Sequence, residues 1–334
     1  MEKDENFQSD LQAEEMHFTI EIDKVGLEDV KKRIEIHRPD GSYSINLNIN
    51  AFINLPSHQR GAHMSRSAES IDESITEHLF SPKKNVEEFG VEISRTLLDK
   101  PPYCAKSIVE MEGPLIVQMR QREERESAQS SYYLKCQIIG HRKEQSVAEN
   151  KYGYDIFLSA VADGMIACPC GQEMSREFAM NLINQRDDIN LDKDTLERVL
   201  DIIPIATHNQ RATGSITLQL PKPGMVDVLD IIDTIEGSMS GRICGILKRP
   251  DEARLIRVVH QDPLFTEDVL RRMAWNMCDP KYQNLPDEMK ITLTLVSMES
   301  IHPHQVSAST TMKFKDLRAT VCKFKDLSSS RSCN

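Results

Sequence analysis

The sequence has no long hydrophobic run and no surplus of positive charge. No apolar run approaches the roughly eighteen residues of a membrane-spanning helix, and the first residues, MEKDENFQSD, are acidic where a signal peptide is basic and then apolar. The formal net charge is −11 at pH 7, which argues against generic binding to nucleic acids or anionic membranes. We therefore expect a soluble, cytoplasmic protein that binds neither. An anionic ligand would need a local cluster of cations.

The sequence also lacks a disulfide framework. Its eight cysteines are scattered along the chain, which is typical of a reduced compartment. Cys168 and Cys170 flank a proline at the end of an apolar run. Cysteines this close rarely reach the Cα separation of an unstrained disulfide, and common structural zinc sites place roughly two to four residues between their cysteines. The two are therefore not expected to act as a pair: Cys168 is either a buried hydrophobe that closes a strand or a single thiolate ligand.

The elements that the pattern predicts begin with two strands and two helices. Residues 43–52 alternate apolar and polar side chains, the period of a half-buried antiparallel strand, and residues 17–23 form an earlier strand candidate. Two helical patterns follow, with apolar residues at Ile71, Ile75 and Leu79, and at Val86, Phe89, Ile93 and Leu97. Strand patterns at 107–119 and 131–141 complete this unit.

After residue 150 the same order returns. Strands are predicted at 154–168 and 214–220, helices at 225–236 and 266–278, and strands at 290–298 and 306–314. We interpret the chain as an α+β protein of two ββααββ repeats, with antiparallel sheets and helices on one face. The repeats cover residues 15–147 and 148–318. The polar tail, 319–334, is expected to be poorly ordered.

One segment interrupts the second repeat. Residues 171–203 are predicted to form a helical hairpin, in which Phe178 and Leu182 lie four positions apart on the first helix. A capping-box pattern from Asp194 to Glu197 marks the start of the second helix. The hairpin is therefore interpreted as an insertion.

Three stretches of the second half carry metal-ligating or acid–base side chains at strand ends or turns. THNQR contains His208, LKRPDE contains Lys248, Arg249 and Glu252, and MESIHPH contains Glu299, His302 and His304. Each has an ordinary explanation as a surface histidine, a solvated turn or the decoration of an edge strand. Together with Cys168 they supply thiolate, imidazole and carboxylate, which suit Zn²⁺ or Fe²⁺ with one position left for water. Such a metal lowers the pKa of its bound water to about 7, the setting for metal-assisted hydrolysis.

A fourth stretch, LPSHQRGAHMSRS, leaves the clearest strand and enters a helix. It carries His58, Arg60, His63 and Arg66 within nine residues. Guanidinium groups and helix N-terminal amides both bind phosphate oxygens well, so the stretch is a candidate anion site. The alternative is an N-cap loop with incidental cations.

Six motifs in order resemble one family. LPSHQRGAHMSRS, CPC, HNQR, KRPDE, FTED and ESIHPH span the chain from about residue 25 to residue 315, and they resemble the GTP cyclohydrolases of the bacterial type IB and archaeal type IV group. The resemblance implies a tunnelling fold, two ββααββ units per subunit, assembled as a homo-oligomer that is a dimer or a tetramer. It also implies GTP as substrate and an active-site metal.

Carried over motif by motif, the resemblance implies a role for each candidate residue. Cys168 and His208 would bind the metal, with Glu252 as a third or water-bridging ligand. Glu267 of FTED would accept the N1–H and the 2-amino group of guanine as a bidentate pair. Glu299, His302 and His304 would line the metal and relay protons. The candidates for the triphosphate, chosen by charge, are His63, Arg66, Lys248 and Arg249.

The spacing of two motifs favours one branch of the group. In the type IB pattern the cysteine and the histidine are close in sequence, whereas here forty residues separate Cys168 from His208, as in the archaeal type IV enzymes. That resemblance implies Fe²⁺, with Zn²⁺ or Mn²⁺ as alternatives, and 7,8-dihydroneopterin 2',3'-cyclic phosphate, formate and diphosphate as products on the route to methanopterin-type pterins.

Three other functions stay open from the residues. One is a type IB enzyme that keeps the triphosphate. Another is a tunnelling-fold protein that binds a purine or pterin without turnover, which would need only the base anchor. The third is a reductase with a cysteine nucleophile, which would need a nicotinamide cofactor, and the glycine-rich dinucleotide fingerprint is absent.

Overall fold

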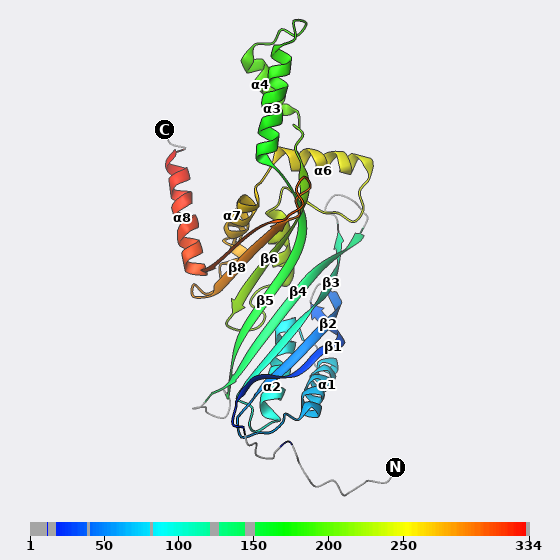
Figure 1. The fold of residues 1–334 in the computed structure, drawn as a ribbon, viewed down its shortest axis with the longest axis vertical. Coiled ribbons are helices and arrows are strands. Elements are labelled where there is room, and N and C mark those ends of the chain that lie inside the picture. Colours follow the sequence, from blue (N-terminus) through cyan, green and yellow to red (C-terminus); the bar gives the residue numbers. More distant parts are fainter. Residues whose placement is uncertain are drawn as a thin grey trace. The chain divides into compact units, whose positions relative to one another are not determined.

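The computed structural model describes residue 12 and residues 18–38, 41–80, 83–120, 127–143 and 151–331 (Figure 1). The chain divides into two compact units. Unit 1 comprises Met1–Ile116, Tyr133–Leu158 and Gln219–Met225, and unit 2 comprises Val117–Tyr132, Ser159–Leu218 and Val226–Asn334. These boundaries differ from those of the sequence repeats, so the division at residue 147 stays a prediction.

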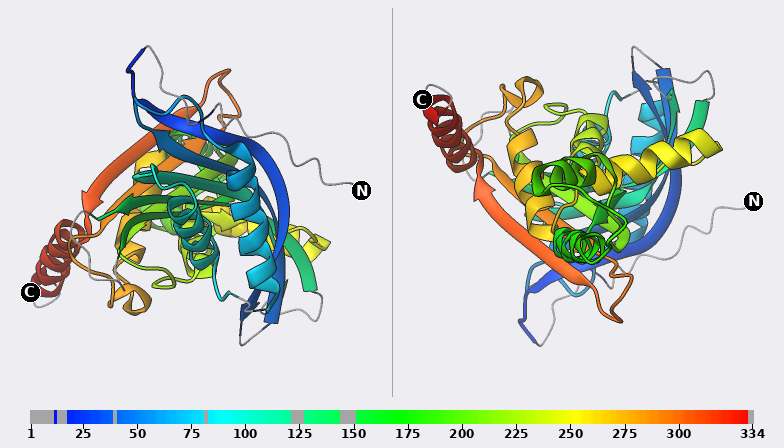
Figure 2. Two further views of the ribbon diagram at one scale, coloured as in Figure 1. Left: turned by 90° about the horizontal axis from the view of Figure 1, so that it is seen from below. Right: turned by 90° about the horizontal axis from the view of Figure 1, so that it is seen from above.

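The first half of the chain has the predicted order of two strands, two helices and two strands. Its elements are β1 (Ile22–Arg38), β2 (Gly41–Leu55), α1 (Met64–Phe80), α2 (Val86–Asp99), β3 (Lys106–Arg120) and β4 (Ser127–Arg142). Strand β2 pairs antiparallel with both β1 and β3. Its alternation is the predicted one, because Ile45, Leu47 and Ile49 are buried. Helices α1 and α2 lie on one face of these strands (Figure 2).

The second half repeats this order. It contains β5 (Tyr152–Ala167), β6 (Asn209–Leu220), α5 (Val228–Gly237), α7 (Thr266–Asn276), β8 (Lys290–Ser297) and β9 (Val306–Lys313). The strand order is β5-β6-β8-β9, with antiparallel pairs β6–β8 and β8–β9, and α7 packs on β8 and β9. The α+β class and the ββααββ duplication are thus confirmed.

Several elements differ from the sequence-based prediction. The first strand begins at Ile22 rather than at residue 17, which lies outside the described residues. A short strand, β7 (Gly241–Arg242), pairs with β5, and LKRPDE opens helix α6 (Arg249–Gln261) instead of forming a turn. The segment expected to be a poorly ordered tail belongs to helix α8 (Phe314–Arg331). Phe314, Leu317 and Val321 are buried, which anchors the start of α8.

The predicted insertion is a helical hairpin of α3 (Pro169–Asn184) and α4 (Lys193–Ile202). The N-cap of α4 is Asp192, whose carboxylate accepts from the Thr195 N–H at 2.9 Å, and not the predicted Asp194. Leu200 is buried, whereas Phe178 of α3 is 65% exposed. Figure 1 shows the hairpin projecting beyond the ends of β5 and β6.

Within the described residues, no helix is both long and apolar enough to cross a membrane.

Candidate metal and substrate site

Cys168 and His208 lie side by side at the corner where β5 ends and β6 begins. The Cys168 N–H donates to the His208 carbonyl oxygen at 3.1 Å, and the Thr207 hydroxyl donates to the Cys168 carbonyl oxygen at 2.9 Å. Cys168 is also the N-cap of α3, because its Sγ accepts from the Gly171 N–H at 3.5 Å. The structure thus brings together the two residues that the sequence analysis placed at the metal.

The hairpin leaves and returns at this same corner. A Cβ atom added to Gly171 would lie 2.6 Å from the Thr207 Oγ1, so only glycine fits where α3 passes the end of the insertion. The Gln172 side-chain amide donates to the carbonyl oxygens of Ile205 at 3.1 Å and of His260 at 2.5 Å. The insertion is therefore closed at its base, and it does not separate Cys168 from His208.

A chain of buried polar contacts extends from His208 to Glu299. The His208 Nδ1 lies 3.0 Å from the Gln210 Oε1, and the Gln210 Nε2 donates to the Glu299 Oε1 at 3.1 Å. The Ser297 hydroxyl donates to the same carboxylate oxygen at 2.7 Å and accepts from Gln210 at 3.3 Å. Gln210 is 8% exposed and Ser297 is fully buried. Glu299, predicted to be catalytic, is thus connected to His208.

Glu252, the predicted third ligand, is not brought to Cys168 and His208 in this chain. It lies in the first turn of α6 and is exposed. The other end of α6 meets the corner, where the His260 Nε2 is 3.4 Å from the Thr207 carbonyl oxygen. Eight residues of helix place Glu252 about 12 Å from His260 along the axis. Among the described residues, no group of three or more His, Cys, Asp or Glu side chains could hold a metal ion.

The predicted cations of α6 and the predicted guanine anchor are solvent-exposed. Lys248 and Arg249 stand at the start of α6, the end of the helix that carries Glu252. Glu267 lies in the first turn of α7. The turn before α7 is tied to the corner, because the Leu264 N–H donates to the carbonyl oxygen of Ala167 at 3.0 Å. Glu267 thus follows a segment that is bonded to the residue preceding Cys168.

His302 and His304 are exposed on the loop between β8 and β9. Their rings are stacked, with centroids 5.1 Å apart and an interplanar angle of 13°. The Met298 N–H donates to the Arg211 carbonyl oxygen at 2.9 Å, which fixes the start of this loop beside β6. The loop therefore carries Glu299 into the polar chain and leaves the two imidazoles open to solvent.

His63 and Arg66 belong to unit 1, whereas all the other predicted site residues belong to unit 2. His63 precedes α1, and its Nδ1 is 3.2 Å from the Tyr103 hydroxyl. The Arg66 N–H donates to the His63 carbonyl oxygen at 3.0 Å. Both residues thus occupy the first turn and the entry of α1, as predicted for an anion site at a helix start.

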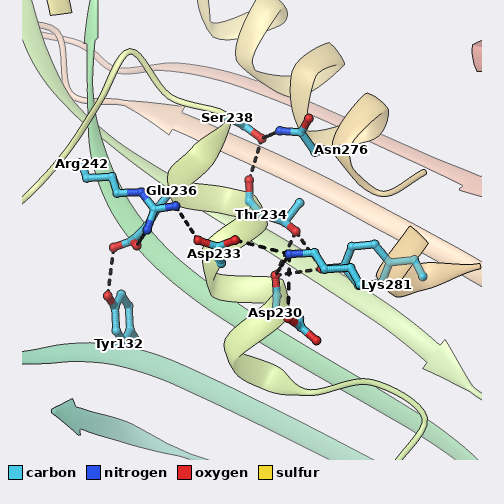
Figure 3. A network of polar contacts seen from close by, with 10 residues as sticks. Tyr132, Asp230, Asp233, Thr234, Glu236, Ser238, Arg242, Asn276 and Lys281 are labelled. Atoms are coloured by element: carbon cyan, nitrogen blue, oxygen red, sulfur yellow. Dashed lines mark hydrogen bonds and ion pairs between the residues drawn. The ribbon is translucent and has the colours of Figure 1, made fainter. Parts of the chain in front are cut away.

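A second polar network joins α5 to Tyr132 of β4 and to Arg242 of β7, the short strand that pairs with β5 (Figure 3). The Tyr132 hydroxyl donates to the Glu236 Oε1 at 3.0 Å, and Arg242 contacts the Glu236 and Asp233 carboxylates at 3.3 and 2.5 Å. Burial raises the pKa of Glu236 above its usual value, and it raises the pKa of Tyr132 to about 12. Because Arg242 pairs with Gly164 of β5, this network holds the strand that ends at Cys168.

Sequence reasoning missed several residues of the site. Gln210, Ser297, Thr207 and His260 all contact the corner or the polar chain. A signal for Gln210 was present in HNQR, since residues two apart on a strand face the same side. No comparable signal identifies His260, which reaches the corner only through the course of α6.

The fold and the site define a class: a duplicated ββααββ protein in which a cysteine and a histidine are joined through their backbones at a strand corner, and an amide connects the imidazole to a carboxylate. The chain belongs to the type I GTP cyclohydrolase folE2 family, whose model matches residues 9–308.

Its relatives include archaeal proteins that match almost end to end. GTP cyclohydrolase MptA of Methanosphaera stadtmanae is 33% identical over 92% of this chain and 96% of its own length. GTP cyclohydrolase MptA of Methanocaldococcus jannaschii is 31% identical over 96% of this chain and 99% of its own. Among solved structures, a uricase from Bacillus fastidious covers 89% of this chain and 95% of its own, at 10% identity and a TM-score of 0.48. That likeness is too low to carry a conclusion.

Proposed function

We propose that this chain is a metal-dependent GTP cyclohydrolase that converts GTP to 7,8-dihydroneopterin 2',3'-cyclic phosphate, formate and diphosphate, the first step of tetrahydromethanopterin-type pterin synthesis. The observation that carries the proposal is the backbone hydrogen bond between Cys168 and His208, which lie on either side of the inserted α3–α4 hairpin. The relatives named GTP cyclohydrolase MptA support the same reaction, since they match over nearly their whole length.

The chemistry of the donors at the corner fits a metal such as Fe²⁺, with Zn²⁺ or Mn²⁺ as alternatives. A thiolate and an imidazole are ligands that these ions accept. Cys168 and His208 would hold the metal, and when bound it would supply an activated water at neutral pH. Glu252 is proposed as the third or water-bridging ligand. Val259, near the end of α6, is the one buried residue of this helix, so the first turn, which carries Glu252, is exposed where substrate or a second subunit would meet it.

The remaining groups are proposed to bind GTP and to move protons. Glu267 would accept the N1–H and the 2-amino group of guanine, which a carboxylate can do with both oxygens. Glu299, His302 and His304 would hold and transfer the protons that opening of the imidazole ring and release of formate require. Glu299 is well placed for this because Gln210 and Ser297 orient its carboxylate.

The residues proposed to bind the triphosphate are Lys248, Arg249, His63 and Arg66. We propose a homo-oligomer, a dimer or a tetramer, as the active form. Light scattering on the protein with and without GTP tests the assembly. Charge-removing variants at Lys248 and Arg66 should each raise the KM for GTP more than they lower kcat, since uniform binding is lost.

Anaerobic incubation of the protein with Fe²⁺ and GTP tests the reaction itself. Release of formate together with a pterin that fluoresces after oxidation is the expected result. The absence of both products would overturn the proposed function. A parallel incubation with Zn²⁺ and Mn²⁺ ranks the metals.

A type IB reaction is the second candidate, and the description of the matching family favours it. Mass spectrometry of the product separates the two. A cyclic monophosphate with free diphosphate supports the type IV reaction, and an intact triphosphate supports the type IB reaction.

A further inference from the structure

The side-chain amide of Gln210 lies between an imidazole and a carboxylate. Its Oε1 faces the His208 Nδ1 at 3.0 Å, and its Nε2 faces the Glu299 Oε1 at 3.1 Å and the Ser297 Oγ at 3.3 Å. The proposed function uses only the contact of this amide with Glu299, and its contact with His208 has no role there.

The carboxylate fixes which way the amide points. An ionised Glu299 can only accept hydrogen bonds, so the nitrogen of the Gln210 amide must face it. The carbonyl oxygen of that amide then faces His208 and can only accept. A neutral His208 therefore carries its proton on Nδ1, which leaves the lone pair on Nε2 as the one that can bind a metal.

The arrangement is rigid because it is buried and held by paired strands. Gln210 is 8% exposed, Ser297 is fully buried, and β6 and β8 pair in register at Ala212 and Ser297. The Ser297 hydroxyl donates to Glu299 at 2.7 Å and so also holds the carboxylate in place. A side chain without this amide would remove one hydrogen bond from the His208 Nδ1 and one from the Glu299 carboxylate, which would keep its bond from Ser297.

We infer that Gln210 is a positioning residue, which holds His208 as the Nδ1–H tautomer and thereby presents Nε2 to the metal. Groups that hydrogen-bond to a metal-binding histidine set its tautomer and ring orientation and raise its basicity as a ligand. The link to Glu299 makes the orientation of the imidazole depend on that carboxylate. The metal part of this inference rests on the proposed function, whereas the tautomer of His208 does not.

The first test needs no metal. Nitrogen-15 NMR of the metal-free protein labelled at histidine distinguishes the two neutral tautomers, and the His208 signals are assigned by their loss in His208→Asn. We expect the Nδ1–H tautomer in the wild type and a mixture or the Nε2–H tautomer in Gln210→Leu. An Nε2–H tautomer in the wild type would overturn the inference.

The second test measures the affinity of the metal-free protein for Zn²⁺ alone, by competition with a chromophoric chelator. Gln210→Leu should bind roughly 10- to 100-fold more weakly than the wild type. Gln210→Glu keeps an acceptor for the Nδ1–H and should lose less affinity than Gln210→Leu. The matched control is Gln219→Leu, which removes a partly buried glutamine of the same strand bonded to Asp155 and should bind like the wild type.

The outcomes separate the two proposals. If the wild type binds Zn²⁺ and Gln210→Leu binds it equally well, the inference fails and the proposed metal site stands. If the wild type binds none of Zn²⁺, Fe²⁺ and Mn²⁺, the proposed function fails, and the tautomer measurement still decides the positioning of His208. Thermal unfolding of all four proteins checks the fold, and Gln210→Glu keeps the test valid should Gln210→Leu not fold.

Discussion

The backbone N–H of Cys168 donates to the carbonyl oxygen of His208 at 3.1 Å, although forty residues separate them. Between these two positions the chain forms the whole α3–α4 hairpin and returns. The hairpin therefore separates Cys168 and His208 along the sequence but leaves their backbones hydrogen-bonded to each other. The sulfur of Cys168 caps α3, and the same sulfur is the atom proposed to bind the metal.

Serine at position 168 should separate these two functions. Ser is a good N-cap, so Cys168→Ser should keep α3 and the fold, whereas it removes the thiolate from the metal. We expect the variant to lose bound Fe²⁺ and GTP turnover at an unchanged unfolding temperature. The matched control is Cys170→Ser, because Cys170 is exposed and should be dispensable. Turnover and metal content in Cys168→Ser equal to the wild type would exclude Cys168 as a ligand.

A methyl group at Gly171 should disturb the corner through Thr207. The added Cβ would lie 2.6 Å from the Thr207 Oγ1, so Gly171→Ala should lower the free energy of unfolding by about 1–3 kcal/mol. Thr207→Ala alone loses the bond to the Cys168 carbonyl, worth roughly 0.5–1.5 kcal/mol. In the double variant the clash is absent, so its loss should be smaller than the sum. Urea unfolding of the four proteins measures this coupling, and simple additivity would contradict the packing argument.

The stability of the α3–α4 hairpin should depend on its buried face only. Leu200 of α4 is 5% exposed and Leu182 of α3 is 48% exposed. Leu200→Ala should cost about 2–5 kcal/mol within the hairpin, and Leu182→Ala should stay within about 0.5 kcal/mol. Hydrogen exchange of the α3 and α4 amides is the suitable measurement, since a local loss appears there first. Equal protection in the two variants would show that the buried face does not hold the hairpin.

Periodicity predicted the fold because burial repeats with the geometry of the element. The alternation at Ile45, Leu47 and Ile49 gave β2, and the insertion was visible as an interruption of a repeated order. Helix α6 was missed because it is mostly exposed and its apolar face is short, with Val259 buried and Leu255 half-buried. Helix α8 could have been found: Phe314, Leu317 and Val321 are buried at helical spacing, but the polar composition of the segment outweighed them.

The site was predictable only in part, since a list of ligands contains no geometry. The resemblance placed Cys168 beside His208, and the structure joins their backbones by a hydrogen bond, which no spacing rule would have predicted across forty residues; their role as metal ligands stays a prediction. For Glu252 the resemblance and the structure differ. The resemblance implies a place beside Cys168 and His208, whereas the residue lies at the end of α6 that is far from them. Gln210 lies within the HNQR motif, but an amide side chain in a motif does not by itself indicate a role at a metal site. Its importance follows from what its two ends face.

Stability should depend on pH through Glu236, in a direction that the burial of this residue determines. Burial raises its pKa in the folded chain above the ordinary value of 4.5, against the opposing effects of Tyr132 and Arg242. Between the two pKa values the folded state holds more protons than the unfolded state, so the free energy of unfolding falls as the pH rises through this window. The stabilisation is complete below pH 4.5 and is lost as the pH passes the folded pKa.

The side chain of Glu236→Gln cannot titrate, so this variant should lack the pH-dependent part of the stability that Glu236 contributes. The difference in unfolding free energy between the wild type and Glu236→Gln, from urea titrations across a pH series, should therefore fall from about pH 4.5 upward and then level off. Glu288 provides a control of opposite sign, because hydrogen bonds from Lys313 and Lys315 lower its pKa to about 2. The difference in unfolding free energy between the wild type and Glu288→Gln should rise between pH 2 and 4.5. This difference should shrink in high salt because the carboxylate is exposed. A flat profile for Glu236→Gln relative to the wild type would mean that this carboxyl titrates alike in both states, which its burial in α5 argues against.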